Sequence, residues 1–121
     1  MNTVLINVNF NDKLKTGLKV LRVWFEDEYT KVDLGFLYSD ERENFIKITE
    51  DIYLSDYHTK RKLIECTGIN LNEEIRLKSI KDFRYFSLKF EPFDNVKEKL
   101  MLVQSNDDFR FAIIAIEMPK K

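Results

Sequence analysis

The chain has 121 residues, of which 44% are hydrophobic, so its length and composition suit one domain, predicted to span 1–121, with a core of its own. Its 20 Lys and Arg nearly balance its 21 Asp and Glu, and a net charge of −1 disfavours a protein whose main task is to grip a phosphate backbone. With Cys66 as its one cysteine and His58 as its one histidine, the chain can form neither an intramolecular disulfide nor a structural zinc site of the usual kind, and no metal or cofactor is expected.

Apolar residues recur with a period of two along most of the chain, which predicts strands rather than helices. Residues 75–82 fit neither period, and one helical turn is expected at 96–99. The last strand is apolar on both faces and is therefore expected to be central and buried. In chain order, strands are expected at 4–10, 18–25, 30–38, 45–48, 52–54, 62–66, 83–90, 100–104 and 109–118, with a tight turn at 105–108.

Alternation within these strands predicts which side chains share a face. In the strand 18–25, Leu21, Val23 and Phe25 are expected on one face, and Val20, Arg22 and Trp24 on the other. In the strand 30–38, the apolar set is Thr30, Val32, Leu34 and Phe36, and the opposite set is Lys31, Asp33 and Gly35. In the strand 83–90, Phe86, Leu88 and Phe90 oppose Phe83, Tyr85 and Ser87.

About eight or nine short strands, separated by turn signals about every 8–12 residues, are typical of an antiparallel β-sandwich. The predicted fold class is therefore all-β, with an immunoglobulin-like sandwich as the favoured architecture. A small Greek-key or OB-like barrel is the alternative.

The order of strand types also resembles a known family. The segments that carry the resemblance are 30–36, 45–48, 52–54, 62–64, 68–71, 86–93, 100–104 and 109–118. Together they resemble an uncharacterised immunoglobulin-like β-sandwich domain of secreted or cell-envelope proteins of Bacteroidetes bacteria. The resemblance covers about residues 20 to 118. It implies a fold and a bacterial source, and it implies no catalytic residues.

No catalytic constellation is found, so the chain is predicted not to be an enzyme. A Ser or Cys nucleophile would need His58 as its base, and no nucleophile-elbow sequence accompanies that residue. Cys66 lies in a predicted strand and is interpreted as a small buried hydrophobic residue. The pairs at 50–51 and 73–74 are adjacent carboxylates, whereas glycoside hydrolysis needs two that face each other across a cleft.

Two sets of residues are candidate binding sites. Trp24 and Tyr85 lie on the less apolar faces of their strands, and exposed aromatic side chains there would mark a surface that binds a protein or a sugar. The second set is a basic cluster in a predicted turn, which could contact phosphate or an acidic partner or could simply be solvated. Its residues are Tyr57, Lys60, Arg61 and Lys62.

These observations favour a non-enzymatic module for protein interaction or self-association, with a protein partner or a homo-oligomer expected and no membrane insertion. Binding of nucleic acid or another anionic ligand through the basic loop is the first alternative, and carbohydrate binding is the second. The N-terminal residues show no signal peptide and no run is long enough for a transmembrane helix. The sequence as written therefore predicts a cytoplasmic protein, and a periplasmic or envelope location if a signal peptide has been removed.

Overall fold

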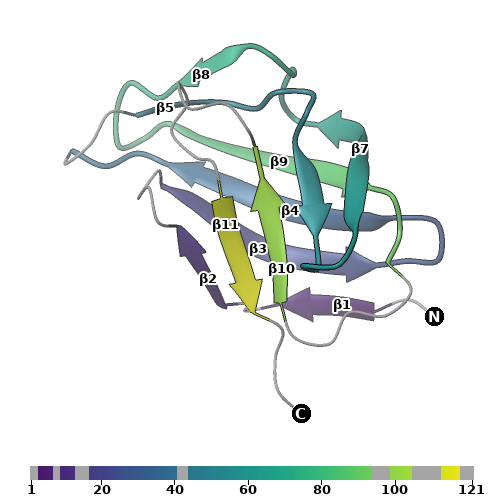
Figure 1. Ribbon diagram of the computed structural model, residues 1–121. Helices are drawn as coiled ribbons and strands as arrows, with labels where there is room; N and C mark the ends of the chain where they lie inside the picture. Colours follow the sequence, from purple (N-terminus) through teal and green to yellow (C-terminus); the bar gives the residue numbers. More distant parts are fainter. Residues whose placement is uncertain are drawn as a thin grey trace.

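The computed structural model describes residues 3–6, 9–12, 17–40, 44–93, 99–104 and 113–117. Within these residues the chain is all-β and contains no helix. Nine strands form one antiparallel sheet that curls into a half-barrel, and two more form a small second sheet (Figure 1). The predicted all-β class is thus confirmed, with an architecture consistent with a sandwich or a barrel-like fold.

Across the large sheet the strands follow the order β1-β3-β4-β9-β7-β6-β10-β11-β2, and the small sheet pairs β5 with β8. The strands are β1 Thr3–Ile6, β2 Asn9–Asp12, β3 Leu18–Phe25, β4 Thr30–Leu37, β5 Phe45–Lys47, β6 Tyr53–Ser55, β7 Lys60–Thr67, β8 Glu74–Arg76, β9 Phe83–Phe90, β10 Lys99–Val103 and β11 Ile113–Glu117.

The core lies on the concave side of the curled sheet, where alternate residues of each strand point inward. β4 illustrates the pattern, since its inward set is completely buried, as the sequence predicts. The predicted apolar face of β9 is also buried. The largest fully buried side chains are Phe36, Phe90, Leu18, Leu34, Ile46, Ile48, Ile52, Leu54, Leu88, Leu100 and Leu102.

A bulge in β3 overturns part of the predicted facing of that strand. Val20 pairs with Leu34, but Arg22, two residues later, pairs with Asp33, the next residue along β4. Leu21 is the extra residue, and a single extra residue reverses the alternation on one side of it. Val20 is therefore in the core and Leu21 is exposed on the opposite face, where the sequence pattern predicts the reverse.

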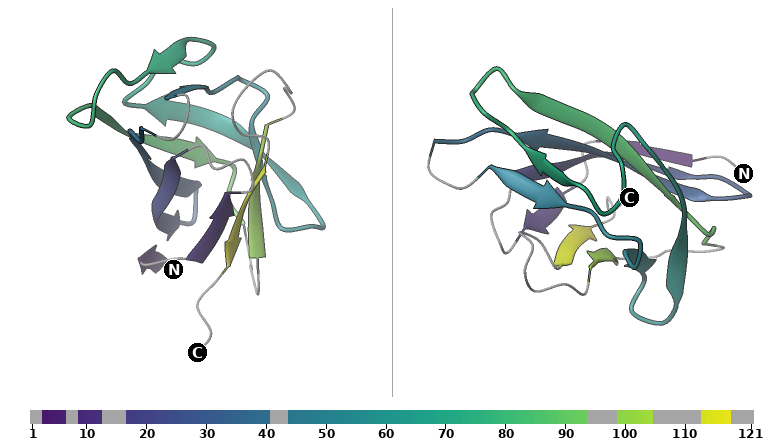
Figure 2. Two further views of the ribbon diagram at one scale, coloured as in Figure 1. Left: turned by 90° about the vertical axis from the view of Figure 1, so that its left-hand side faces the viewer. Right: turned by 90° about the horizontal axis from the view of Figure 1, so that it is seen from above.

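β7 joins the two halves of the half-barrel. Its first residues, Lys60 to Lys62, pair with β6, while Leu63 to Thr67 pair with β9. The register shifts between Leu63 and Glu65, and bulges of this kind bend a strand and increase its twist. Seen from above in Figure 2, the strands around β4 and β9 face those around β10 and β11 across the core.

Three regions differ from the prediction. The expected single strand at 4–10 is two strands, and they lie at opposite edges of the sheet: β1 pairs with β3 and β2 pairs with β11. The ambiguous region 75–82 contains the short strand β8. β11 lies between β10 and the edge strand β2, one strand from the edge rather than at the centre. The expected helical turn at 96–99, apart from Lys99 in β10, and the turn at 105–108 lie outside the described residues.

Two buried amides attach the small sheet to the large one. Gln104 follows β10 and is fully buried; its Nε2 donates to the carbonyl of Lys47 at 2.8 Å, and its Oε1 accepts from the amide of Thr49 at 2.8 Å. Asn44 bridges the start of β5 to Ser39 with a similar pair of bonds, 2.8 and 2.9 Å long. Because buried backbone groups need partners, these two side chains fix the segment that leads into β5 and out of it.

Candidate interaction face

The residues of β3, β4 and β9 that point away from the core form a continuous surface, here called the outer face. Three neighbouring strands bring its residues side by side, because Asp33 lies between Arg22 and Ser87, and Gly35 lies between Lys19 and Tyr85. Both aromatic residues nominated from the sequence, Trp24 and Tyr85, are on this face. Its members are Lys19, Leu21, Arg22 and Trp24 from β3, Lys31, Asp33 and Gly35 from β4, and Phe83, Tyr85, Ser87 and Lys89 from β9.

Asp33 is the centre of a polar cluster on the outer face. Its Oδ2 accepts a hydrogen bond from Trp24 Nε1 at 2.6 Å and lies 3.0 Å from Arg22 Nε, while its Oδ1 accepts from Ser87 Oγ at 2.6 Å. Lys31 Nζ lies 3.9 Å from Oδ1. A carboxylate that is almost completely buried needs such partners, and here neighbouring strands supply them. The cluster therefore couples β3, β4 and β9 on the side away from the core.

Trp24 is held in place by this cluster rather than freely exposed. Besides its bond to Asp33, its ring lies under two cations, with Arg22 Cζ at 5.5 Å and Lys31 Nζ at 4.7 Å from the ring centre. Cation–π contacts of this length are attractive. The indole is half-buried as a result, so Trp24 shapes the outer face more than it projects from it.

Tyr85, Phe83 and Leu21 form an exposed apolar group, here called the aromatic patch. Tyr85 is 59% exposed and Phe83 is 49% exposed, and their ring centres are 5.0 Å apart with the planes tilted by 54°. Gly35 lies beneath them: a Cβ on that residue would be 3.4 Å from Tyr85 Cε1 and 3.6 Å from Leu21 Cδ1. The tyrosine ring and the leucine thus lie over Gly35 at distances that a Cβ on this residue would still fit.

Gly68 packs closely against the backbone of β9, the strand that carries Phe83 and Tyr85. It follows β7 with φ +95°, and a Cβ there would lie 2.6 Å from the carbonyl oxygen of Tyr85 and 3.1 Å from Phe86 Cα. Only glycine combines this backbone conformation with so close an approach. The turn after β7 therefore packs directly on the backbone of β9 at the position of the patch.

The outer face is basic although the chain as a whole is not. Its positions carry the four cations Lys19, Arg22, Lys31 and Lys89, against the carboxylate of Asp33 and, on the adjacent strand β7, that of Glu65, which pairs with Lys89. The whole chain has a net charge of −1. The excess of positive charge is therefore local to the surface that also carries the aromatic patch.

The basic cluster nominated from the sequence is divided by the alternation of β7. Lys60 and Lys62 point to one side, where Lys60 Nζ lies 4.7 Å from the centre of the Tyr53 ring. Arg61 points to the other side, with Cζ 4.9 Å from the ring centre of the buried Phe93, and its Nε is buried without a hydrogen-bond partner. The three cations do not form one patch.

Tyr57, the fourth residue of that set, is at the tip of the β6–β7 turn. It is 57% exposed and has φ +77°, a conformation that residues other than glycine rarely adopt. Asp56 closes the turn: Oδ1 accepts from the amides of Thr59 at 2.7 Å and His58 at 2.9 Å. These hydrogen bonds stabilise the carboxylate and hold the pKa of Asp56 below its ordinary value of 3.8, with the bond from the Thr59 amide as the largest cause.

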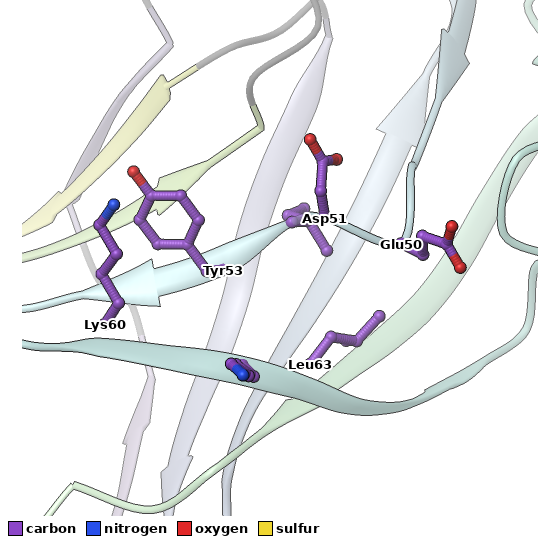
Figure 3. Close-up of a pocket in the computed structure, with 7 residues that line it drawn as sticks. Glu50, Asp51, Tyr53, Lys60 and Leu63 are labelled. Carbon is purple, nitrogen blue, oxygen red and sulfur yellow. The ribbon is translucent and has the colours of Figure 1, made fainter.

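A shallow groove of about 420 Å³ opens where β6 and β7 diverge (Figure 3). Figure 3 shows the carboxylates of Glu50 and Asp51 at one end and Lys60 beside Tyr53 at the other. The two carboxylates come from a single turn, closed by a bond from the amide of Ile52 to the carbonyl of Thr49, so they do not oppose each other as glycoside hydrolysis requires. The lining residues are Glu50, Asp51, Ile52, Tyr53, Lys60, Lys62 and Leu63.

The sequence alone indicated part of this face. Alternation placed Tyr85 and Phe83 opposite the buried residues of β9, and it placed Trp24 beside Arg22. Leu21 was missed because of the bulge in β3, which leaves no sequence signal that we recognise. The sequence predicts that the face of Asp33 is solvated or pairs charges across strands, and the ion pair with Arg22 agrees with the second alternative. The hydrogen bonds that Asp33 accepts from Trp24 and Ser87 were not predicted.

Comparisons with protein-family models, with curated proteins and with solved structures found no match for this chain. Across the part of the chain that the structure describes, no helix has the length and apolar character needed to span a membrane. In the same residues, no three His, Cys, Asp or Glu side chains come together in a way that could hold a metal ion.

Proposed function

We propose that this chain is a non-enzymatic protein-binding module whose binding surface is the outer face. The observation that carries the proposal is the aromatic patch: two neighbouring aromatic side chains, each about half exposed, lie on a central strand of the sheet. Aromatic side chains in such positions are typical anchors of protein interfaces, because they bury a large area with little loss of conformational freedom.

The surroundings of the patch favour binding through a preformed surface. Tyr85 pairs with Gly35 of β4 on one side, and on the other side the turn at Gly68 packs closely against its carbonyl oxygen. The polar cluster of Asp33 fixes the neighbouring part of the same face. A surface that is already ordered loses little entropy when a partner binds, and this increases affinity for a given contact area.

The two alternatives have less support. A phosphate-binding loop would need its three cations on one side, where they could contact the same anion. Arg61 instead points away from Lys60 and Lys62 and lies over the ring of Phe93. A carbohydrate site would need an open aromatic ring on which a sugar could stack. In the groove beside Tyr53, the ammonium group of Lys60 lies over that ring instead. The outer face is therefore the surface on which we base the proposal.

Affinity capture with matched baits tests the proposal. The wild-type chain, the double variant Phe83→Ser/Tyr85→Ser and the control Tyr57→Ser would each be immobilised and exposed to a lysate of the native cell. Tyr57 is a suitable control because it is as exposed as Tyr85 but lies at the tip of a different hairpin. We expect at least one protein to be enriched by the wild type and the control and lost with the double variant. Equal enrichment by all three baits would contradict the proposal.

The family and the compartment remain predictions. The immunoglobulin-like assignment, the Bacteroidetes source and an envelope location all depend on the resemblance of strand patterns described above. Fractionation of the native cell with an antibody to the chain would separate a cytoplasmic protein from one in the periplasm or envelope.

A further inference from the structure

We infer that the partner contacts the outer face through an acidic segment that carries an apolar or aromatic anchor residue. The inference rests on the proposed function, since it specifies what the same surface binds. Two features on one face support it: the aromatic patch supplies a place for an apolar side chain, and the cations Lys19 and Arg22 lie beside that place.

The cations lie close enough to act on a ligand that covers the patch. Lys19 pairs with Gly35, which pairs with Tyr85, so Lys19 is two strands from the tyrosine, or about 10 Å. Arg22 lies two pairs further along the same strands, and its side chain is 50% exposed although it also contacts Asp33. A segment that covers the patch and extends across β4 toward β3 can bring its own carboxylates within the screening length of these cations, which is about 8 Å at physiological ionic strength.

Asp33 does not cancel this positive field. Its side chain is only 8% exposed, and the groups around it leave little of the carboxylate accessible to a ligand. Near the aromatic patch, the outer face therefore presents mainly the ammonium group of Lys19 and the guanidinium group of Arg22 to a partner. Acidic residues flanking an apolar anchor complement this arrangement, because each carboxylate meets a cation while the anchor is desolvated over Gly35 and Tyr85.

The same charge distribution argues against a second copy of the chain as the occupant. A two-fold dimer through this surface would bring together two copies of the same surface, each with a net positive charge. Like charges across an interface are unfavourable. An acidic partner avoids this repulsion.

A single-stranded nucleic acid would also combine negative charge with flat apolar rings, and it is the competing occupant. Successive bases stack on aromatic rings that present open faces along the strand. Here the rings of Phe83 and Tyr85 are tilted by 54° and pack on each other, so they do not form two parallel platforms. The observations therefore favour a peptide segment, and a nucleic acid is an outcome of the test.

Fluorescence anisotropy with three labelled probes tests the inference on the intact chain. The probes are a synthetic peptide of glutamates with one central phenylalanine, its counterpart in which lysines replace the glutamates, and an oligothymidylate. The variants are Lys19→Glu with its control Lys60→Glu, and Tyr85→Ala with its control Tyr57→Ala. Each control removes a group of the same type from the β6–β7 hairpin.

We expect the acidic peptide to bind, the lysine peptide not to bind, and affinity to fall as salt is raised. Charge reversal at Lys19 should weaken binding about fivefold, which corresponds to one exposed ion-pair interaction, and Tyr85→Ala should weaken it at least as much. Both controls should bind like the wild type. Because salt dependence is measured on the wild type, the result does not depend on the folding of any variant.

Three outcomes would overturn the inference. The acidic peptide could fail to bind up to about 1 mM, the weak end of measurable affinity. It could bind equally well to Lys19→Glu, or the oligothymidylate could bind more tightly than the peptide. The capture experiment separates failure of this inference from failure of the proposed function. If a captured partner depends on the aromatic patch but its binding does not depend on charge, the proposed function stands and only the inference of an acidic segment is wrong.

Discussion

Replacing Asp33 by Ala tests whether the outer face is held together by its polar cluster. The substitution removes the acceptor of two short hydrogen bonds, from Trp24 Nε1 and Ser87 Oγ, and the partner of Arg22. Each hydrogen bond to a charged acceptor contributes about 1.5–3 kcal/mol. The side chain of Arg22 is half exposed, so water can solvate its guanidinium group when Asp33 is removed. Loss of this ion pair therefore adds little to the loss of stability. We therefore expect the free energy of unfolding to fall by about 3–6 kcal/mol.

Urea denaturation followed by tryptophan fluorescence measures this loss, and Trp24 is the one tryptophan of the chain. The matched variant is Ser87→Ala, which removes one of the two bonds and should cost about 1.5–3 kcal/mol. In the double variant the two losses should not add, because the bond between these residues can be lost only once. A loss below about 1 kcal/mol for Asp33→Ala, or full additivity with Ser87→Ala, would refute the described cluster.

Three further predictions concern single positions. Gly68→Ala should lower the free energy of unfolding, measured by urea denaturation. The strained φ alone costs about 1–3 kcal/mol, and the clash of the new Cβ with the backbone of Tyr85 adds to this loss. An unchanged midpoint of denaturation would contradict this prediction. Gly35→Ala should be neutral or stabilising by about 0.5–1 kcal/mol, since a Cβ fits there at ordinary contact distance, and a loss of stability would show that the space is tighter than described. Asp56→Ala should cost about 1 kcal/mol near neutral pH. Folding lowers the pKa of Asp56, so its contribution to stability should be fully present above pH 3.8 and should vanish as the pH falls through the pKa of the folded state. A difference in melting temperature between the wild type and Asp56→Ala that persists below that pKa would contradict the prediction.

The fold class was accessible from the sequence because period-two patterning is a local signal. In β4, Val32, Leu34 and Phe36 are buried at every second position, as are Phe86, Leu88 and Phe90 in β9, and the predicted facing of both strands is confirmed. The same alternation placed Tyr85 away from the core. What the pattern predicts is therefore the side of the sheet on which a residue lies, provided that the strand has no bulge.

The errors arose where structure depends on residues distant in the chain. The bulge that exposes Leu21 is defined by pairing with β4, and the division of 4–10 into β1 and β2 depends on the two edges of a sheet that the rest of the chain builds. The split of the basic cluster follows from alternation too. The sequence does not predict this split, because residues 57–62 have the composition of a polar turn, whereas β7 already begins at Lys60.

The candidate interaction face was only partly predictable for a related reason. A Trp and a Tyr on polar strand faces can be recognised in a sequence, but their mutual position cannot. Only the pairing of β3, β4 and β9 shows that Gly35 separates Leu21 from Tyr85 and that Asp33 holds Trp24. The basic character of this face is equally hidden in the sequence, because nearly balanced charges elsewhere in the chain mask it.

The most direct test of the account is the dissociation constant of a captured partner for the chain and two variants, measured by calorimetry. Tyr85→Ala removes the most exposed ring of the aromatic patch, and Tyr57→Ala removes an equally exposed ring at the tip of the β6–β7 turn. If the outer face is the binding surface, Tyr85→Ala weakens binding at least about tenfold and Tyr57→Ala leaves it unchanged. Equal affinity of all three proteins, or a loss confined to Tyr57→Ala, would contradict the account.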